Sequence, residues 1–323
     1  MARPVKLAVG FLVYGSATAK YLPAFVKSLL LAVEKSGSSA RFWCWDNQPA
    51  DQSNHSFLMD YPQINYLSGV ENIGFGRAYN ILITEALAWD ADYFLVVNPD
   101  TLWSEEAIEK LLAAIMLNDK LGSVVPKVFY WDFLLNKKTK RLDSCGIVKL
   151  SGLRFVDIGQ GETDHGRFDN AKVLGPSGCA GLYRVSALQS VTTSGQYFDE
   201  LMFMYKEDSD LAMRLKLAGW KSELVPSAGV WHDRSVAGRG IGLLARLKAQ
   251  ATKNQKAKLW SRKHQLVLVW KYWRQESLFG LMKLFFGLVA EGLYALIFDR
   301  SLLSAWTWFW KNKKRIIIPK RIK

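Results

Sequence analysis

Two groups of acidic side chains are best suited to chemistry in this sequence. The first is Asp100, which closes the segment Asn98-Pro99-Asp100 directly after the apolar run Tyr93–Val97. A carboxylate beyond the end of a buried strand is free to bind Mg²⁺ or Mn²⁺, and such ions also bind substrate phosphates. Asn-Pro-Asp is also the composition of an ordinary strand-ending turn, so the segment alone leaves both interpretations open.

The second group is Glu207, Asp208 and Asp210, in a helix predicted to begin near Glu207 and to run to Ala218. Asp210 and Arg214 are four residues apart and can pair on one helix face. The other two acids remain at the helix N-terminus. A carboxylate there either complements the helix dipole or acts as a general base on an acceptor hydroxyl. The residues alone slightly favour the dipole.

His232 and a glycine-containing segment are weaker candidates. His232 follows the apolar run Leu224–Val230, and its imidazole could bind a metal or a phosphate oxygen, although a lone histidine is more often structural. The segment 72–80 carries Gly74 and Gly76 before a predicted helix, which would let the backbone approach a diphosphate. A GxG pattern by itself is not specific.

A series of apolar runs and helical patterns must position these side chains. Continuous apolar runs predict strands that are buried on both faces, at Lys6–Val13, Arg41–Trp45, Ile64–Leu67 and Tyr93–Val97. Helical spacing is found at 21–35 and 78–88. A further helix is predicted after an N-cap at Ser104, with Glu105 and Glu106 in its first turn.

This alternation of strands and helices predicts a parallel sheet with helices on both faces. Ligands bind beyond the carboxyl ends of such strands, so the loops after these four strands should converge on one crevice. The middle of the chain is less regular. Strands are expected there at Val124–Tyr130, Gly146–Leu150 and Val173–Leu174, around a glycine-rich loop at 159–170.

Composition limits the classes of function. The chain has 323 residues, 50% of them hydrophobic, so it can bury a large core. Its three cysteines form no CxxC, which argues against a disulfide framework or a zinc site and fits a reducing compartment. Of the 43 Lys/Arg and 29 Asp/Glu, 20 and 4 lie from His232 onward. A basic tail on a near-neutral body is not the pattern of a nucleic-acid-binding protein.

The order of six segments is more specific than any one of them. They are WDNQPADQS, ENIGFGRAYN, VVNPDT, GPSGCAGLYRVSAL, FDELMFMYKEDSDLAMRLKLAGW and VWHDRS. In this order they resemble the family 2 glycosyltransferases, above all the branch with rhamnosyl- and galactofuranosyltransferases, over about residues 5–235. The resemblance implies a GT-A fold, which is an α/β Rossmann-like mixed sheet flanked by helices. It also implies a nucleotide-diphospho-sugar donor, a divalent metal and inversion at the anomeric carbon.

The resemblance assigns donor-site roles by motif position. Asp46 would contact the base of the nucleotide. The donor pocket would be lined by Asn72, Gly74, Arg77 and Asn98. Asp100 would also contact the donor and would take the metal-binding last position of a DxD-like motif. Asn98 replaces the first Asp of that motif, so fewer carboxylates would hold the Mg²⁺ or Mn²⁺.

The remaining assignments concern the sugar, the acceptor and the base. The donor sugar or the acceptor would be contacted by Gly178, Cys179, Ala180 and Glu207. Asp208 matches the catalytic base, and His232 matches a ligand of the metal or the diphosphate. In a single displacement the acceptor hydroxyl attacks the anomeric carbon opposite the departing nucleotide diphosphate. The base and the metal must therefore lie on opposite sides of the sugar, and two acidic sites from distant segments fit that requirement.

Residues 1–235 are therefore predicted to form the catalytic domain, and 236–323 a helical, basic region. Six of the thirteen tryptophans lie in this region. Lys283, Glu291 and Asp299 interrupt its most apolar stretch, so no uncharged run reaches the roughly 18–20 residues of a spanning helix. SAWTWFW followed by KNKKR is typical of a helix that lies on an anionic membrane surface. The alternative is a helical subdomain that packs on the catalytic domain or on a second subunit.

The expected activity is transfer of a sugar, with dTDP-L-rhamnose as the first guess for the donor, to a glycan or lipid-linked acceptor in cell-surface polysaccharide synthesis. The enzyme would be peripheral, at the cytoplasmic face of the cell membrane, without a nucleic-acid partner, and a homo-oligomer is left open. A sugar-nucleotide nucleotidyltransferase is the alternative enzyme, but the loop Gly15–Thr18 is too short and uncharged for its phosphate-binding loop. A non-enzymatic basic membrane adaptor would not need acids at strand and helix ends.

Overall fold

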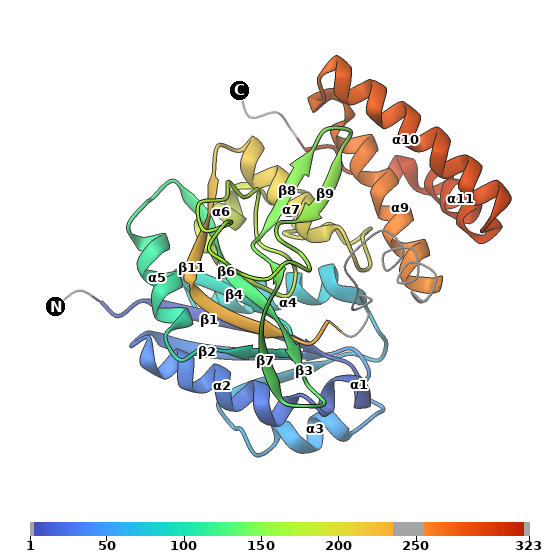
Figure 1. Ribbon diagram of the computed structural model, residues 1–323. Coiled ribbons are helices and arrows are strands. Elements are labelled where there is room, and N and C mark those ends of the chain that lie inside the picture. Colours follow the sequence, from blue (N-terminus) through green and yellow to red (C-terminus); the bar gives the residue numbers. More distant parts are fainter. Residues whose placement is uncertain (1–2, 235–254, 320–323) are drawn as a thin grey trace.

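The computed structural model describes residues 3–234 and 255–319, and one large sheet lies at the centre of the body (Figure 1). The predicted domain boundary at 235/236 falls outside the described residues. The strands of the sheet are β1 (Lys6–Val13), β2 (Ser39–Asp46), β3 (Ile64–Ser68), β4 (Tyr93–Val97), β5 (Thr101–Trp103), β6 (Leu121–Asp132), β7 (Lys137–Ser144), β10 (Ala180–Arg184) and β11 (Lys221–His232). Their spatial order is β3-β2-β1-β4-β10-β6-β11-β5, with β7 paired to β6.

The sheet is mixed rather than wholly parallel. β3, β2, β1 and β4 run parallel, as the alternation of strands and helices predicted. β10 is antiparallel to both β4 and β6, and β5 is antiparallel to β11, whereas β6 and β11 are parallel to each other. A separate hairpin consists of β8 (Ile147–Leu150) and β9 (Arg154–Asp157). The mixed α/β architecture implied by the resemblance is confirmed.

Helices cover both faces of the sheet, which explains the continuous apolar runs. The helices before His232 are α1 (Gly15–Ala19), α2 (Leu22–Lys35), α3 (Ser53–Leu58), α4 (Gly74–Ala88), α5 (Ala107–Met116), α6 (Val185–Ser190) and α7 (Glu207–Leu217). Successive side chains of a strand point to opposite faces. Leu7, Val9 and Phe11 of β1 pack with α2 and α5, while Ala8 packs with α4, α6 and α7. The central strands β1 and β4 are therefore apolar along nearly their whole length.

Two helices begin at residues other than those predicted. α4 begins at Gly74 rather than at Ala78, so its glycines belong to the first turn. Gly74 has φ +81°, and a Cβ atom there would lie 2.5 Å from the carbonyl oxygen of Phe203. The absence of a side chain lets Phe75 donate its backbone N–H to that oxygen at 2.8 Å. The start of α4 is thereby joined to the segment that precedes α7.

Ser104 does not cap α5, and this prediction is wrong. The helix begins at Ala107 after Glu106, and no side chain caps it, so Glu105 and Glu106 precede its first turn. The backbone N–H of Ser104 instead donates to the carbonyl of Gly229 at 3.1 Å. The cause is the short strand β5, which pairs with β11 and holds this part of the chain in the sheet.

The middle of the chain also differs from the prediction. β6 and β8 were expected, although β6 is longer than its apolar run. Val173–Leu174 forms no strand, and only a single bridge joins Ile147 to Gly175 nearby. β7, β9 and β10 were not predicted. β7 has the sequence KKTKRLDS and lies at a sheet edge, where the polar side chains of its first half meet solvent.

The helices after residue 254 pack on the body that contains the large sheet. They are α9 (Gln255–Tyr272), α10 (Leu278–Ile297) and α11 (Leu303–Asn312), with 3-10 turns η1 (Trp273–Gln275), η2 (Arg300–Leu302) and η3 (Lys313–Arg315). Leu266, Val267 and Leu268 share a buried cluster with Met202 and Met213 from the body. Figure 1 shows the three helices together at one flank, beside β8 and β9. By length and composition α10 is apolar enough to cross a membrane.

Candidate active site

A cavity of about 450 Å³ opens beyond the carboxyl ends of β4 and β11. Its other walls are the loop before β10, the first residues of α7 and the inner side of the β8–β9 hairpin. Most of the residues predicted to act in the site line this one cavity: Asn98, Asp100, Gly178, Cys179, Glu207, Asp208 and His232. Of the four loops expected to converge on one crevice, the loop after β4 lines this cavity, whereas the loops after β1, β2 and β3 do not.

Asp100 and His232 face each other because β5 pairs with β11. His232 Nε2 lies 3.3 Å from Asp100 Oδ2, and the backbone N–H of Asp233 donates to the Asp100 carbonyl at 2.9 Å. Asp100 Oδ1 is buried and has no hydrogen-bond partner among the described residues. Buried polar atoms are nearly always satisfied, so this oxygen is available for a ligand.

Asp143 and Arg234 complete a buried charge network behind His232. His232 Nδ1 lies 2.8 Å from Asp143 Oδ2, while Arg234 donates to Asp143 at 2.9 Å and to Asp157 at 3.1 Å. Burial would raise the pKa of Asp143, but the hydrogen bond from His232 and the charge of Arg234 lower it to about 2. Asp143 therefore stays ionised and fixes the His232 ring, so that Nε2 faces Asp100.

The His232 ring is itself strongly influenced by these acids. Burial opposes a charged imidazole, but the carboxylate of Asp100 and the hydrogen bond with Asp143 raise the pKa of His232 well above its usual range. Cys179 lies close by, with its sulfur within 4.8 Å of ligand atoms of Asp143 and His232. Burial raises the pKa of the Cys179 thiol to about 11, so it stays protonated and is a poor ligand for a hard cation.

Asp208 lies in the first turn of α7, and both of its carboxylate oxygens accept hydrogen bonds. Oδ2 accepts from the backbone N–H of Gly178 at 3.0 Å, and Oδ1 accepts from the backbone of Ser209 at 2.6 Å. Burial raises the pKa of Asp208, and the negative charge of Asp157 raises it further. A partly exposed carboxylate of raised pKa in a cavity has the properties of a general base.

The two residues before α7 have unusual backbone conformations. Tyr205 has φ +71° and Lys206 has φ +77°, which is the left-handed region that non-glycine residues rarely adopt. Both side chains line the cavity, and the turn sets the direction in which α7 begins. Such conformations persist where surrounding contacts hold them, and they cluster at functional sites.

Glu207 differs from its neighbour in its surroundings. Its side chain is buried, and Oε2 has no hydrogen-bond partner among the described residues. Burial, followed by the charge of Asp208, raises the pKa of Glu207 well above its usual range. The neutral form is therefore favoured, and it could donate a hydrogen bond to a sugar hydroxyl.

The other predicted residues do not line the cavity. Ala180 begins β10 directly behind it. Asp46 is buried at the end of β2, where it accepts hydrogen bonds from the Tyr66 hydroxyl at 2.8 Å and from a backbone N–H. Asn72 accepts from the N–H of Gly74 at 2.9 Å, and Arg77 lies 4.0 Å from Glu200. Their roles toward a nucleotide stay predictions.

Several cavity residues were not found from the sequence. They are Asp143, Asp157, Lys206, Phe155 and Ser261, among others. Asp143 is the next-to-last residue of β7 and Asp157 is the last residue of β9, two strands whose apolar signals are too weak to recognise. Ser261 lies on α9, and nothing in the local sequence places that helix beside the loop before α7. Lys206 alone had a usable signal, since it precedes the two predicted acids.

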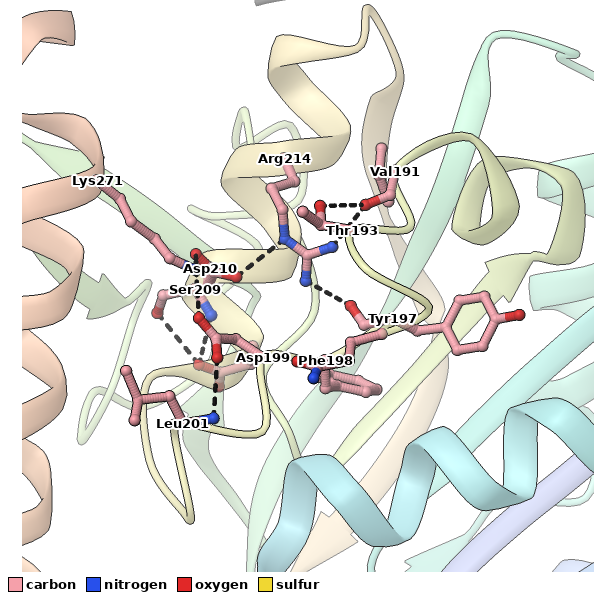
Figure 2. A network of polar contacts seen from close by, with 12 residues as sticks. Val191, Thr193, Tyr197, Phe198, Asp199, Leu201, Ser209, Asp210, Arg214 and Lys271 are labelled. Carbon is pink, nitrogen blue, oxygen red and sulfur yellow. Dashed lines mark hydrogen bonds and ion pairs between the residues drawn. The ribbon is translucent and has the colours of Figure 1, made fainter. Parts of the chain in front are cut away.

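A second charge network joins α7 to the C-terminal helices (Figure 2). The predicted pair is confirmed, with Arg214 Nε donating to Asp210 at 2.9 Å. Lys271 of α9 donates to Asp210 at 2.8 Å and to Asp199 at 2.6 Å, and the Tyr272 hydroxyl donates to Asp210 at 2.7 Å. Burial would raise the pKa of Asp210, but Lys271 and Arg214 lower it to about 2. Asp210 is therefore an ionised structural acid and is unavailable as a base.

Comparison with known sequences gives one family and a curated relative. Residues 11–192 match the model of the family described as Glycosyl transferase family 2. The chain is 31% identical over 230 residues to N-acetylglucosaminyl-diphospho-decaprenol L-rhamnosyltransferase from Mycobacterium tuberculosis (strain ATCC 25618 / H37Rv). The match covers 67% of this chain and 72% of that protein.

Comparison with solved structures supports the fold. The mannosyltransferase PcManGT from Pyrobaculum calidifontis, in complex with GDP-Man and Mn²⁺, has a TM-score of 0.51 and 14% identity, covering 97% of this chain and 76% of that one. TarS 1–349 from S. aureus, in complex with UDP-GlcNAc, has a TM-score of 0.50 and 15% identity, covering 82% and 66%. At these identities the likeness concerns the fold alone.

Proposed function

Because the chain belongs to glycosyl transferase family 2, and so is an enzyme that uses a nucleotide-sugar donor, we propose that it is an inverting L-rhamnosyltransferase. The observation that carries this proposal is the single cavity in which Asp208 faces the same space as Asp100 and His232. The proposed donor is dTDP-L-rhamnose. The proposed acceptor is a hydroxyl of a lipid-linked saccharide used in cell-surface polysaccharide synthesis. The name of the M. tuberculosis relative supports L-rhamnose as the transferred sugar and a lipid-linked acceptor.

Asp208 is the proposed catalytic base. It accepts the proton of the acceptor hydroxyl, and the oxygen of that hydroxyl bonds to the anomeric carbon. The bond between this carbon and the nucleotide diphosphate breaks, and attack from the opposite side inverts the configuration. The hydrogen bonds from Gly178 and Ser209 fix the direction of the carboxylate, which is the requirement for a positioned base.

A divalent cation, Mg²⁺ or Mn²⁺, is proposed to bind at Asp100 and His232. The buried oxygen Asp100 Oδ1 lacks a partner among the described residues, and His232 Nε2 faces the same carboxylate. The cation would take the place of the proton on His232 Nε2. When bound, the cation would neutralise charge on the diphosphate leaving group. Asn98 offers only a neutral amide, so binding depends on one carboxylate. The Mn²⁺ in the complex of PcManGT supports this choice of cofactor.

Asp100→Ala is expected to weaken the metal-dependent binding of the donor, because it removes the only carboxylate proposed to hold the cation. The measurement is calorimetric titration of the nucleotide sugar with Mn²⁺ and with EDTA. Wild-type affinity should fall on addition of EDTA, while the variant should bind weakly in both. Asp60→Ala, at an exposed acid away from the cavity, is the control. Equal Mn²⁺-dependent affinities of Asp100→Ala and the control would refute the site.

Asp157→Asn is expected to shift the acidic limb of the kcat–pH profile to lower pH. The base acts in its unprotonated form, and the charge of Asp157 contributes to the raised pKa of Asp208. Removing that charge lowers the pKa of Asp208, so the active form persists to lower pH. The profile is measured at saturating substrates, with Asp60→Asn as the control. A limb that stays in place or moves to higher pH contradicts the electrostatic coupling.

The position of Lys206 supports the proposal that the acceptor is negatively charged. Its side chain lines the cavity two residues before the base and forms no ion pair within the described part of the chain. In a saccharide linked to a lipid diphosphate, the first sugar carries its reactive hydroxyl one ring away from the phosphates. An ammonium group beside the base is thus well placed for such a diphosphate. The contact is part of the proposal.

The test is a transfer assay with defined donors and acceptors. Full-length enzyme and Mn²⁺ are incubated with dTDP-L-rhamnose, UDP-galactofuranose, UDP-GlcNAc or GDP-mannose. The acceptors are N-acetylglucosaminyl-diphospho-lipid and a neutral alkyl glycoside of the same sugar. Rhamnose transfer to the diphospho-lipid, with inverted configuration by NMR, is expected. Transfer from another donor would replace rhamnose in the proposal. Formation of a sugar nucleotide from a sugar phosphate would favour the nucleotidyltransferase instead.

We place the enzyme at the cytoplasmic face of the membrane as part of the same proposal. Its three cysteines are free and buried, which fits a reducing compartment. The relative's lipid-linked substrate supports a location at a membrane. Residues 1–235 are proposed as the catalytic domain and 236–323 as the membrane-associating region.

A further inference from the structure

One face of α10 is apolar and exposed along the whole helix. Its side chains are Leu278, Phe279, Met282, Phe285, Phe286, Val289, Leu293, Leu296 and Ile297, each between 44% and 78% exposed. At 3.6 residues per turn these positions fall within an arc of about 120°. An apolar helix face that is exposed along its whole length indicates a binding surface.

The opposite side of α10 is packed against the rest of the molecule. Gly280 and Ala295 are buried, and Leu284 and Leu288 pack on the cluster shared by the body and α9. Glu291 forms an ion pair with Arg262 of α9. A helix that crossed a bilayer would have to release all these contacts and take Glu291 into the hydrocarbon. The packing therefore favours a helix that lies along the body with only its outer face free.

The described part of the C-terminal region carries a net positive charge, and Lys283 of α10 lies over the ring of Phe279 on this face. Residues 255–319 contain twelve Lys/Arg and three Asp/Glu. Four of the basic residues, Lys311, Lys313, Lys314 and Arg315, follow directly on the tryptophans of α11, of which Trp310 is 56% exposed. An apolar face with aromatic residues and nearby cations matches the surface of an anionic bilayer.

We propose that α10 lies in the plane of an anionic membrane, with this face inserted at the boundary between headgroups and acyl chains. The β8–β9 hairpin connects the face to the cavity. Its turn places Gly152 against Lys283 and Leu284, and the Gly152 N–H donates to Glu276 at 2.9 Å. The other end of the hairpin, at Phe155 and Asp157, lines the cavity.

Docking through α10 therefore holds one wall of the active site at the membrane surface. An acceptor could then reach Asp208 while its lipid stays in the bilayer. This consequence for the acceptor rests on the proposed function, whereas membrane docking itself does not.

The test compares two matched double variants of the full chain. One is Phe285→Glu with Phe286→Glu, in the middle of the apolar face, where the side chains are 62% and 63% exposed. The control is Leu134→Glu with Leu135→Glu, a pair that is 83% and 74% exposed. The control pair lies in the β6–β7 turn, at the opposite end of the molecule from α10 (Figure 1). Sedimentation is measured with vesicles of phosphatidylcholine alone and of phosphatidylcholine with phosphatidylglycerol.

Wild type and control should bind the anionic vesicles, and binding should weaken as salt rises. The Phe285/Phe286 variant should bind them about tenfold or more weakly, because two charges enter the apolar face. Equal binding by the two variants overturns the proposal. The proposal is also overturned if the wild-type protein does not bind the vesicles but forms a dimer, and the α10 variant does not form that dimer. Extraction with alkaline carbonate should release the protein, and retention would show that α10 spans the bilayer instead.

A transfer assay separates this proposal from the function. With a short, water-soluble diphospho-acceptor the α10 variant should match wild type, and with acceptor in vesicles it should be about tenfold or more slower. Equal rates with the vesicle acceptor would contradict the role in acceptor access. If wild-type enzyme transfers to neither acceptor, the proposed function fails while the vesicle-binding result still decides the docking of α10.

Discussion

Asp208→Asn is expected to lower the rate of sugar transfer by about 10²–10⁴-fold, which is the usual contribution of a general base. Asparagine keeps the size of the side chain and can still accept the hydrogen bond from Gly178, but it cannot take a proton. Donor affinity should stay unchanged, because the donor's phosphates are proposed to bind through the cation held by Asp100 and His232. The measurement pairs single-turnover transfer rates with calorimetric titration of the donor.

Glu207→Gln is the matched comparison for this prediction. Glu207 is adjacent in the same helix turn, but it is buried and its raised pKa favours the neutral acid. Glutamine can still donate and accept hydrogen bonds there, so the loss of rate should be far smaller than for Asp208→Asn. Near-normal turnover of Asp208→Asn would remove it as the base. A larger loss of rate in Glu207→Gln would assign the role of catalytic base to Glu207 instead.

Strands and helices buried on two sides could be predicted from the sequence. β1 and β4 occupy the predicted residues, and α7 begins at the predicted Glu207, because continuous apolar runs and helical spacing are local signals. β7 could not be found, since half of its side chains face solvent and are basic. β5 is three residues long and exists only because β11 pairs with it. Neither feature is encoded in a local pattern.

The same distinction applies to the candidate site. Asp100, Asp208 and His232 lie at the ends of elements that the sequence predicts, so the crevice between them could be expected. Asp143 and Asp157 reach it only through tertiary pairing of strands that have weak signals of their own. The position of α9 beside the base was also unforeseen, since it depends on a contact between Lys271 and acids far away in the chain. Contacts of this kind are decided by burial and charge balance in the folded state.

Lys271→Met is expected to lower the free energy of unfolding by about 3–5 kcal/mol, the usual cost of breaking a buried ion pair from one side. The Lys271 side chain is 2% exposed, and it lies between Asp199 and Asp210, which are 7% and 0% exposed. With Lys271 removed, Asp199 loses its ion pair and Asp210 keeps only the one with Arg214, and neither buried carboxylate can be rehydrated without opening the packing. The measurement is urea unfolding at neutral pH.

Lys258→Met on the same helix is the control, since Lys258 is only half-buried and forms no ion pair within the described residues. Lys271→Arg should recover part of the stability because it restores the charge. If Lys271→Met unfolds at the same urea concentration as Lys258→Met, the network does not hold α9 to the body.

The network also changes what removal of the C-terminal region should do. If the C-terminal region were only a detachable membrane anchor, a chain that ends near Lys258 would lose sedimentation with membranes and keep its activity. In the structure such a chain also lacks Lys271, Tyr272 and His264, whose Nδ1 lies 2.8 Å and 2.9 Å from the carbonyls of Met204 and Tyr205. Those carbonyls belong to the left-handed turn before the base. The truncated chain should therefore lose transfer to a soluble acceptor as well as membrane binding. Full transfer without α9 would show that the base segment holds its conformation unaided.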